Sequence, residues 1–286
     1  MGLLHRIAPW LEAGPLALVL VVFFGVPMLV VVGVSFMGLD RLDIVPSFTL
    51  ENYTELLASN LALRLYLGSL KFAAIVWAIT LVIGFTVAYF LVFHVRSPLW
   101  QMGLFLLCTV PFWTSNIIRM ISWIPFLGRN GIFNQALVGA GVVDQPLEFL
   151  LFSDFAVVVV YVHLYTLFMI VPIFNSMARI DRSLIEAARD AGASDWRILT
   201  DVVVPLSKTG IALGTIFVVT LVMGDFFVIR VMSGGQSASV VSALSNEIAS
   251  LQYPPAAASA VVLVIVVTLI VSAVLRIVDV RRELLG

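Results

Sequence analysis

The sequence predicts an all-α integral membrane protein with six transmembrane helices. Hydrophobic residues make up 61% of the 286 residues and charged residues only 12%, which is half of the roughly 25% charged residues typical of a soluble domain. The mean hydropathy is +1.10. Six apolar runs each reach the length of about 20 residues that a helix needs to cross a bilayer. So few charged side chains could not cover a soluble protein of this size.

The six apolar runs give the expected positions of the spans. The first run is longer than the ~7–15 residues of a secretory signal, so we expect it to remain as a helix. The runs are unbroken, as in "AVVVVYVHLYTLFMIV", whereas strands of a membrane barrel alternate in polarity over about 10 residues. We expect the whole chain, residues 1–286, to form a single transmembrane domain. The expected spans are residues 15–37, 67–93, 101–125, 153–175, 209–230 and 254–276.

The distribution of positive charge predicts the orientation in the membrane. Cytoplasmic loops carry an excess of Lys and Arg, and ten of the 16 basic residues fall on one side if the N-terminus is cytoplasmic. Both termini are therefore predicted to be cytoplasmic, and residues 181–206 become a cytoplasmic connection between spans four and five. The ten residues are Arg6, Arg96, Arg179, Arg182, Arg189, Arg197, Lys208, Arg276, Arg281 and Arg282.

Residues 181–206 have the pattern of two short helices in an otherwise apolar chain. Ser183 and Glu186 have the spacing of a capping box, and Glu186 also lies one helical turn from Arg182 and Arg189, as ion pairs require. Gly192 is expected to end the first helix in the left-handed conformation.

The second of these helices is expected to begin at Ser194 or Asp195 and to be closed by Pro205 before span five. The first helix carries small side chains on one face, at Ala187, Ala188 and Ala191. This face is suited to close docking into a groove of a partner protein. The alternative is a solvated helix that serves only as a loop.

A resemblance to a known family bears on these alternatives. Glu186-Ala187-Ala188, followed by Gly192 and Pro205, resembles the EAA–G–P motif of the permease subunits of ATP-binding cassette importers. The six-span layout agrees with that family. Four further stretches, "VPFWTSNIIRM", "GVVDQPLEFL", "LIEAARDAGAS" and "VPLSKTGI", resemble the spermidine/putrescine-type permeases.

The resemblance implies that residues 181–206 contain a coupling helix that docks into a cognate ATPase. It implies four partners: a related but different permease chain, an ATP-binding cassette ATPase dimer, an extracytoplasmic solute-binding protein and the lipid of a bacterial inner membrane. The implied docking residues are Glu186, Ala187, Ala188, Asp190, Ala191, Gly192 and Ala193.

The sequence contains no phosphate-binding loop of the kind that holds ATP. A phosphate-binding loop needs Gly-Lys, and the only lysines, Lys71 and Lys208, follow Leu70 and Ser207. We therefore expect a chain without catalytic residues, metal or bound cofactor, with ATP and Mg on the ATPase. The net charge of −1 and the absence of a basic cluster indicate no nucleic-acid partner.

Asp225 is the leading candidate for the translocation path, because ionisable residues inside a membrane usually face the interior of a bundle. It would offer a carboxylate to the ammonium groups of a polyamine, and nearby aromatic rings could add cation–π contacts. The alternative is that Asp225 pairs with Arg119 or Arg230, and that the aromatic rings only pack. The candidate path residues are Trp113, Asn116, Arg119, Tyr161, Tyr165, Asp225 and Phe226.

Arg230 counts against a purely cationic solute unless a carboxylate neutralises it. The alternatives are therefore a zwitterionic, amino-acid-like or anionic solute. A secondary transporter is a further alternative, with Asp225 as its proton site, but the charged segment would then have no purpose. An integral-membrane enzyme is disfavoured because the three histidines are scattered and no G-x-S-x-G motif is present.

Overall fold

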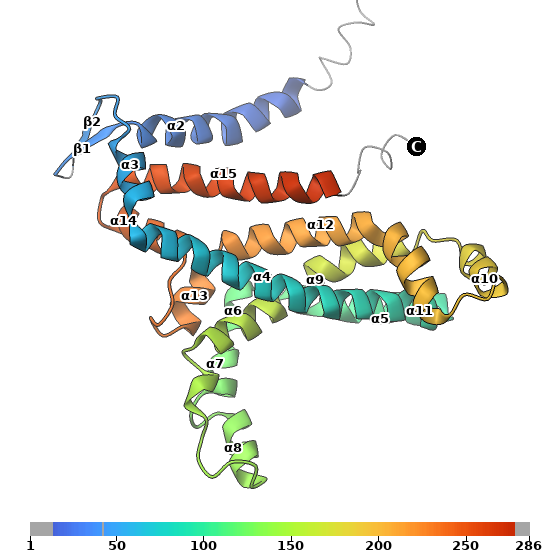
Figure 1. The fold of residues 1–286 in the computed structure, drawn as a ribbon. Helices are drawn as coiled ribbons and strands as arrows, with labels where there is room; N and C mark the ends of the chain where they lie inside the picture. The colour runs from blue at the N-terminus through green and yellow to red at the C-terminus, as the bar shows by residue number, and fades with distance from the viewer. Residues whose placement is uncertain (1–13, 42, 278–286) are drawn as a thin grey trace, which may run out of the picture. The chain divides into compact units, whose positions relative to one another are not determined.

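The structure is a computed structural model that describes residues 14–41 and 43–277 (Figure 1). Arg6, Arg281 and Arg282, on which the predicted orientation depends in part, lie outside the described residues. The described chain divides into two compact units. One comprises residues 14–63 and 243–266, and the other comprises residues 64–242 and 267–277.

The first unit contains the N-terminal span and a small hairpin. Its strands pair antiparallel with Leu39 opposite Ile44, a feature that the all-α prediction did not include. The Asn52 side chain donates hydrogen bonds to the Ser35 and Met37 carbonyls at 3.0 and 2.9 Å, and so joins α3 to the end of α2. The elements are η1 (Val21–Gly25), α2 (Val26–Ser35), β1 (Gly38–Asp40), β2 (Asp43–Val45), α3 (Glu51–Ala58) and parts of α14 (Val240–Ala249) and α15 (Tyr253–Ile277).

The second unit holds the remaining helices. Its core is formed by α9 (Asp154–Met177) and α12 (Val204–Met223), which pack against each other more extensively than any other pair of elements. The other elements are α4 (Asn60–Tyr89), η2 (Phe90–His94), α5 (Pro98–Thr109), η3 (Val110–Trp113), α6 (Asn116–Ile121), α7 (Trp123–Leu127), α8 (Ile132–Gly139), η4 (Glu148–Leu150), α10 (Arg182–Asp190), α11 (Asp195–Ile198), η5 (Leu199–Val203) and α13 (Phe227–Met232).

Within residues 14–41 and 43–277, five helical stretches are long and apolar enough to span a membrane, and a bent pair raises the number to six. The bent pair replaces the straight third span predicted over residues 101–125. Its two parts, Pro98–Trp113 and Asn116–Gly139, meet at 91°. Pro111 lacks an N–H and lies in the 3₁₀ turn that ends the first part. Ser115 then caps α6 by accepting the Ile117 N–H at 3.3 Å, so a new helix direction begins there.

Two glycines allow α9 and α12 to approach each other closely. A Cβ atom at Gly210 would lie 2.4 Å from the Pro172 carbonyl oxygen, and one at Gly214 would lie 2.5 Å from the Met169 sulfur. At Gly210 a side chain would force the helices apart, because it would meet backbone, whereas at Gly214 the Met169 side chain would first have to move. Small residues serve the same purpose at helix interfaces in membranes, where close van der Waals packing holds helices together.

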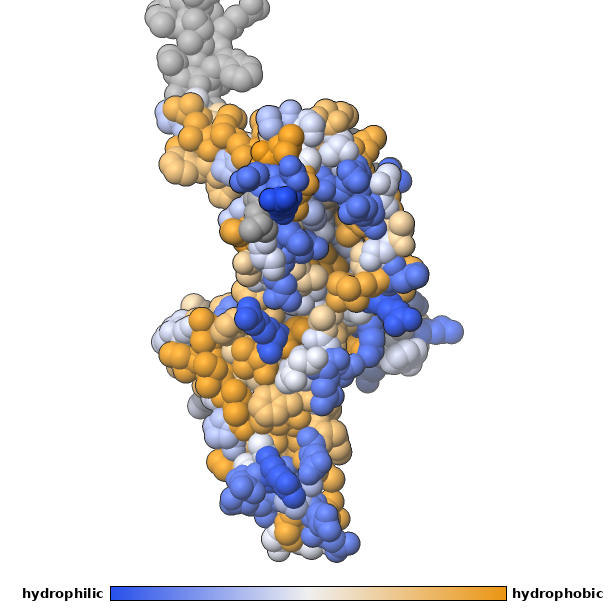
Figure 2. Space-filling model, turned by 90° about the vertical axis from the view of Figure 1, so that its left-hand side faces the viewer, coloured by the Kyte–Doolittle hydropathy of each residue, from blue (hydrophilic) through white to orange (hydrophobic). Residues whose placement is uncertain are grey.

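Large apolar side chains lie open on the surface of the helices. In α2 they include Leu29, which is 71% exposed, and on α15 Leu269 is 65% exposed. Figure 2 shows apolar side chains at the surface over much of the face drawn. Exposed patches of this kind mark contact with lipid or protein, as expected of membrane-spanning helices.

Replacing Gly210 by Ala should weaken the α9–α12 contact. The new methyl group would meet backbone rather than a movable side chain, and overpacking of this kind costs about 1–3 kcal/mol. The measurement is the melting temperature of the purified chain in detergent, which should fall. Gly103→Ala in α5 is the matched control, because its Cβ would meet nothing within 4 Å. An equal fall in both variants would contradict this account.

Candidate functional site

The polar segment, residues 181–206 after α9, begins with a helix cap that differs from the predicted one. Asp181, not Ser183, caps α10, and its carboxylate accepts the Ser183 N–H at 2.9 Å. This backbone hydrogen bond lowers the pKa of the Asp181 carboxyl group. Ser183 is instead the second residue of the helix, so the capping box with Glu186 is not formed. Asp accepts this bond well because a carboxylate at a helix start also interacts favourably with the helix dipole.

The end of α10 and the start of α11 agree with the predictions. Gly192 has φ +82°, the left-handed conformation that favours glycine. The Ala193 N–H donates to the Ala188 carbonyl at 3.0 Å across this turn. Ser194 then caps α11 by accepting the Arg197 N–H at 3.4 Å.

The ion pairs predicted for Glu186 are not formed among the residues that the structure describes. Arg189 instead pairs with Asp195 at 3.2 Å, and Arg182 donates to the Val92 carbonyl at 3.2 Å. Glu186 is exposed and keeps a carboxylate that no described cation neutralises.

Most of the predicted docking residues lie on the surface. Two large apolar side chains lie among them, since Leu184 is 48% and Trp196 is 72% exposed. The segment thus presents apolar and acidic groups together. The exposed members of the predicted set are Glu186, Ala187, Asp190, Ala191 and Gly192, whereas Ala188 and Ala193 are partly buried.

Pro205 does not close the second helix, contrary to the prediction. The chain is helical without a break from Asp195 to Met223, over 29 residues. A π-helical turn, η5, lies immediately before Val204, and its wider ring accommodates a proline that has no N–H to donate. At 1.5 Å per residue the continuous helix is about 43 Å long, so it joins the polar segment to the far end of the span.

Asp225 lies directly beyond that far end, in a short break between α12 and α13. The prediction placed it deep inside a span that continued to residue 230. The helix instead ends at Met223 with Gly224 as its C-cap, and the Asp225 carboxylate accepts the Val228 N–H at 2.9 Å at the start of α13. A glycine that ends one helix and an aspartate that caps the next explain why the apolar run is interrupted there.

Two tyrosines of α9 hold the same carboxylate. The Tyr161 hydroxyl donates to Asp225 Oδ1 at 3.4 Å, and the Tyr165 hydroxyl donates to Asp225 Oδ2 at 3.1 Å. Their rings, four residues apart on one face of α9, stack at 5.6 Å. Tyr161 is fully buried and Tyr165 is 4% exposed. The rings therefore pack in the core, and the hydroxyl groups hold the carboxylate.

Asp225 forms no ion pair with any cation in the described part of the chain, including Arg119 and Arg230. Its three hydrogen-bond donors are neutral, and its side chain is only partly buried. The carboxylate is therefore fixed in place while its negative charge is not neutralised.

Arg119 and Asn116 lie together on α6. Asn116 accepts a hydrogen bond from Arg119, whose guanidinium group lies 4.8 Å from the centre of the Phe112 ring. Arg119 is 6% exposed, and its Nε and Nη1 have no hydrogen-bond partner among the described residues. Phe112 in turn packs against Phe168 of α9 at 4.9 Å.

The remaining predicted path residues, Trp113 and Phe226, form no hydrogen bond with the Asp225 side chain among the described residues. Trp113 is 77% exposed, and Phe226 packs edge-on against Phe227 at 6.1 Å. His163 accepts a hydrogen bond from the Trp123 indole at 2.9 Å.

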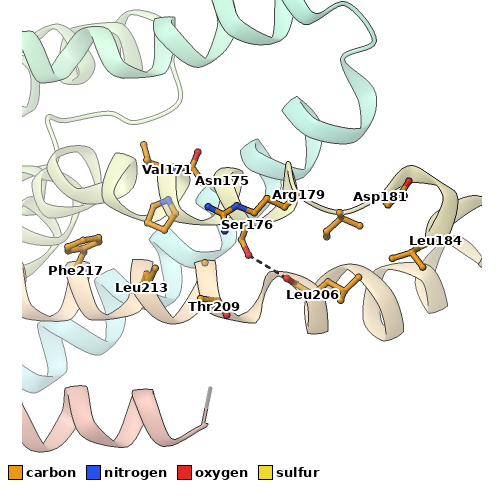
Figure 3. Close-up of a pocket in the computed structure, with 13 residues that line it drawn as sticks. Val171, Asn175, Ser176, Arg179, Asp181, Leu184, Leu206, Thr209, Leu213 and Phe217 are labelled. Atoms are coloured by element: carbon orange, nitrogen blue, oxygen red, sulfur yellow. Dashed lines mark hydrogen bonds between the residues drawn. The ribbon is translucent and has the colours of Figure 1, made fainter. Parts of the chain in front are cut away.

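A groove of about 640 Å³ lies between α9 and α12 beside the polar segment (Figure 3). The Ser176 hydroxyl donates to the Leu206 carbonyl across it at 3.4 Å. Sequence reasoning did not identify this groove. The available signal was polar residues one turn apart near the end of span four, at Asn175, Ser176 and Arg179. The lining is mixed, with apolar residues Val171, Leu213 and Phe217 and polar residues Asn175, Arg179 and Thr209.

Comparison with known proteins places the chain in a family. Residues 97–283 match the family described as "Binding-protein-dependent transport system inner membrane component". The chain is 34% identical over 236 residues to the spermidine/putrescine transport system permease protein PotB of Escherichia coli (strain K12), covering 82% of this chain and 84% of that protein. It is 32% identical to PotB of Haemophilus influenzae, covering 80% and 79%.

Solved structures show the same fold. A chain of the bacterial alginate ABC transporter, in complex with alginate pentasaccharide-bound periplasmic protein, matches with a TM-score of 0.75 at 16% identity, over 96% of both chains. This likeness concerns the fold alone. The sequence matches and the apolar helices together show that the chain belongs to the binding-protein-dependent transport system inner membrane component family, as a multi-pass inner-membrane permease subunit of an ATP-binding cassette importer.

Proposed function

We propose that the whole chain, residues 1–286, works as one permease domain that forms half of a translocation pathway for a polyamine such as spermidine or putrescine. The observation that carries the choice of solute is the Asp225 carboxylate, which neutral donors fix and no described cation neutralises. A protonated amine is the complementary group. The relatives named for spermidine and putrescine transport support the same choice.

Asp225, Tyr161 and Tyr165 form the centre of the proposed path. The tyrosine hydroxyls orient the carboxylate, and their rings are packed away from the solute. Arg119 of α6, with Asn116 and Phe112, adds a positive group that lies against α9 through Phe112 and Phe168. Trp113 and Phe226 complete the proposed path residues. Arg119 and the exposed Arg230 keep a zwitterionic or anionic solute as the alternative that the first experiment below distinguishes.

The polar segment supplies the proposed link to the energy source. With both termini and residues 181–206 in the cytoplasm, α10 would dock on the ATPase dimer, where ATP and Mg are bound. Glu186 supports this role because it is exposed and unpaired among the described residues, and Leu184 and Trp196 add apolar contact area. A second permease, a related but different chain, and an extracytoplasmic solute-binding protein complete the importer.

The unbroken helix from Asp195 to Met223 suggests how docking would move the solute site. Closure of the ATPase dimer would displace α11, and α12 would follow as a rigid element. Because α9 packs tightly on α12, the two helices would tilt together. Their motion would switch the path between inward-facing and outward-facing states, a two-state equilibrium that nucleotide biases.

Replacing Asp225 by Asn should weaken uptake of putrescine by the reconstituted importer. Asn retains the acceptor for the Val228 N–H but removes the charge, and a hydrogen bond to a charged group contributes about 1.5–3 kcal/mol. The KM for putrescine should therefore rise about tenfold or more. Asp154→Asn is the control, because Lys71 already pairs with Asp154 at 2.8 Å. An unchanged KM in Asp225→Asn, or preferred uptake of 4-aminobutyrate by the wild type, would contradict the polyamine assignment.

Reversing the charge at Glu186 should uncouple ATP hydrolysis from uptake. Glu186→Lys changes an exposed group, so the chain should still insert into the membrane, while solute imported per ATP falls at least about fivefold. Both quantities are measured in the same proteoliposomes. The control is Glu148→Lys, which reverses another exposed acidic side chain, in η4 and outside the polar segment. A normal ratio in Glu186→Lys would count against docking.

A further inference from the structure

The end of α4 is closed by side chains from two different parts of the chain. The helix finishes in the π-helical turn η2, whose last backbone bond runs from the Val95 N–H to the Phe90 carbonyl at 3.3 Å. The next two residues, Leu91 and Val92, are 2% and 6% exposed. Carbonyl groups at a helix end have no partner within the helix, and buried ones need an outside donor.

The two donors are Gln101 and Arg182. Gln101 of α5 donates through Nε2 to the Leu91 carbonyl at 3.1 Å. Arg182 donates through Nη2 to the Val92 carbonyl at 3.2 Å. Gln101 comes from the next helix along the chain, whereas Arg182 is the first residue of α10, 90 residues away. A cation at the C-terminal end of a helix is also favoured by the helix dipole.

The Arg182 bond is a narrow connection. A groove of about 400 Å³ beside it is lined by Tyr89 and Phe93 from the end of α4 and by Ile185 and Glu186 of α10. Within the described ranges it is the one hydrogen bond between α10 and the helix formed by α4 and η2. Displacing α10 would therefore pull on the end of α4 through Arg182.

We propose that Arg182 is a positioning residue that transmits movement of the polar segment to α4. The segment would then drive three spans: α9 and α12 by chain continuity, and α4 by this contact. The inference rests on the proposed docking of the segment to an ATPase. The hydrogen bond of Arg182 is to Val92 and not to Asp225 or its tyrosines, so its proposed role is mechanical.

The test compares two substitutions at the same helix end. Arg182→Met removes the donor from the polar segment, and Gln101→Met removes the neighbouring donor from α5. Each leaves one carbonyl of η2 without its partner, so general weakening of this end should be similar. The complete importer is reconstituted with its ATPase, partner permease and binding protein, and putrescine uptake and ATP hydrolysis are measured together.

The expected result is a fall of at least about fivefold in putrescine imported per ATP for Arg182→Met, with a near-normal ratio for Gln101→Met. Arg182→Lys, which keeps a charged donor, should restore most of the ratio. Equal ratios in the two Met variants, or no rescue by Lys, would overturn the inference. If Arg182→Met does not assemble, Arg182→Gln, a shorter neutral donor, replaces it and should also lower the ratio.

Failure of the proposed function gives a different pattern. Wild-type complexes would then show no ATP-driven putrescine uptake, or Glu186→Lys would leave it coupled. If the wild type is coupled and Glu186→Lys is not, a normal ratio in Arg182→Met refutes only the role of Arg182.

Discussion

The close contact between α9 and α12 is the constraint on which the rest of the second unit depends. At Gly210 and Gly214 the two helices are so near that a single Cβ atom would clash with Pro172 or Met169. Contact at this distance favours movement of the two helices as one body, because neither glycine has a side chain that could repack. The polar segment lies at one end of this body, and Asp225 lies just beyond the other.

Under the proposed function, this arrangement would explain how one carboxylate is fixed in place and still able to bind a solute. Asp225 belongs to the break after α12, yet its oxygens are held by hydroxyl groups of α9. A shift of this break relative to the paired helices would therefore change the geometry around the carboxylate. Since the donors are neutral, the proposed function leaves the negative charge for a cation, and release of the solute would follow from separating the carboxylate from the tyrosines rather than from supplying a counter-ion.

The sequence was sufficient for the membrane class and for much of the polar segment, because these depend on local chemistry. Long apolar runs identify spans regardless of tertiary packing, and Gly192 and Ser194 have the conformation and cap that their residue types favour. The helix cap at Asp181 was missed because Ser183 offered an equally good local pattern. The ion pairs predicted for Glu186 are not formed because Arg182 and Arg189 bond to Val92 and Asp195 instead, which helical spacing does not reveal.

The errors in the spans have a related cause. Hydropathy averages over a window, so it passes through the Gly224–Asp225 break and the bend near Ser115 without a signal. Pro205 was taken as a stop because a π turn that accommodates it has no sequence signature. The contact between Tyr165 and Asp225 joins residues 60 positions apart, and the groove at Arg179 depends on how two helices diverge, so neither follows from a pattern along the chain.

The most direct test of the central claim is to ask whether transport requires a separate ATPase. Proteoliposomes containing this chain and its partner permease, with or without the ATPase, are supplied with putrescine-loaded binding protein outside and ATP at the ATPase side. The account predicts uptake only when both ATPase and ATP are present, with hydrolysis stimulated by the loaded binding protein. Accumulation of putrescine by this chain alone along an ion gradient would contradict it.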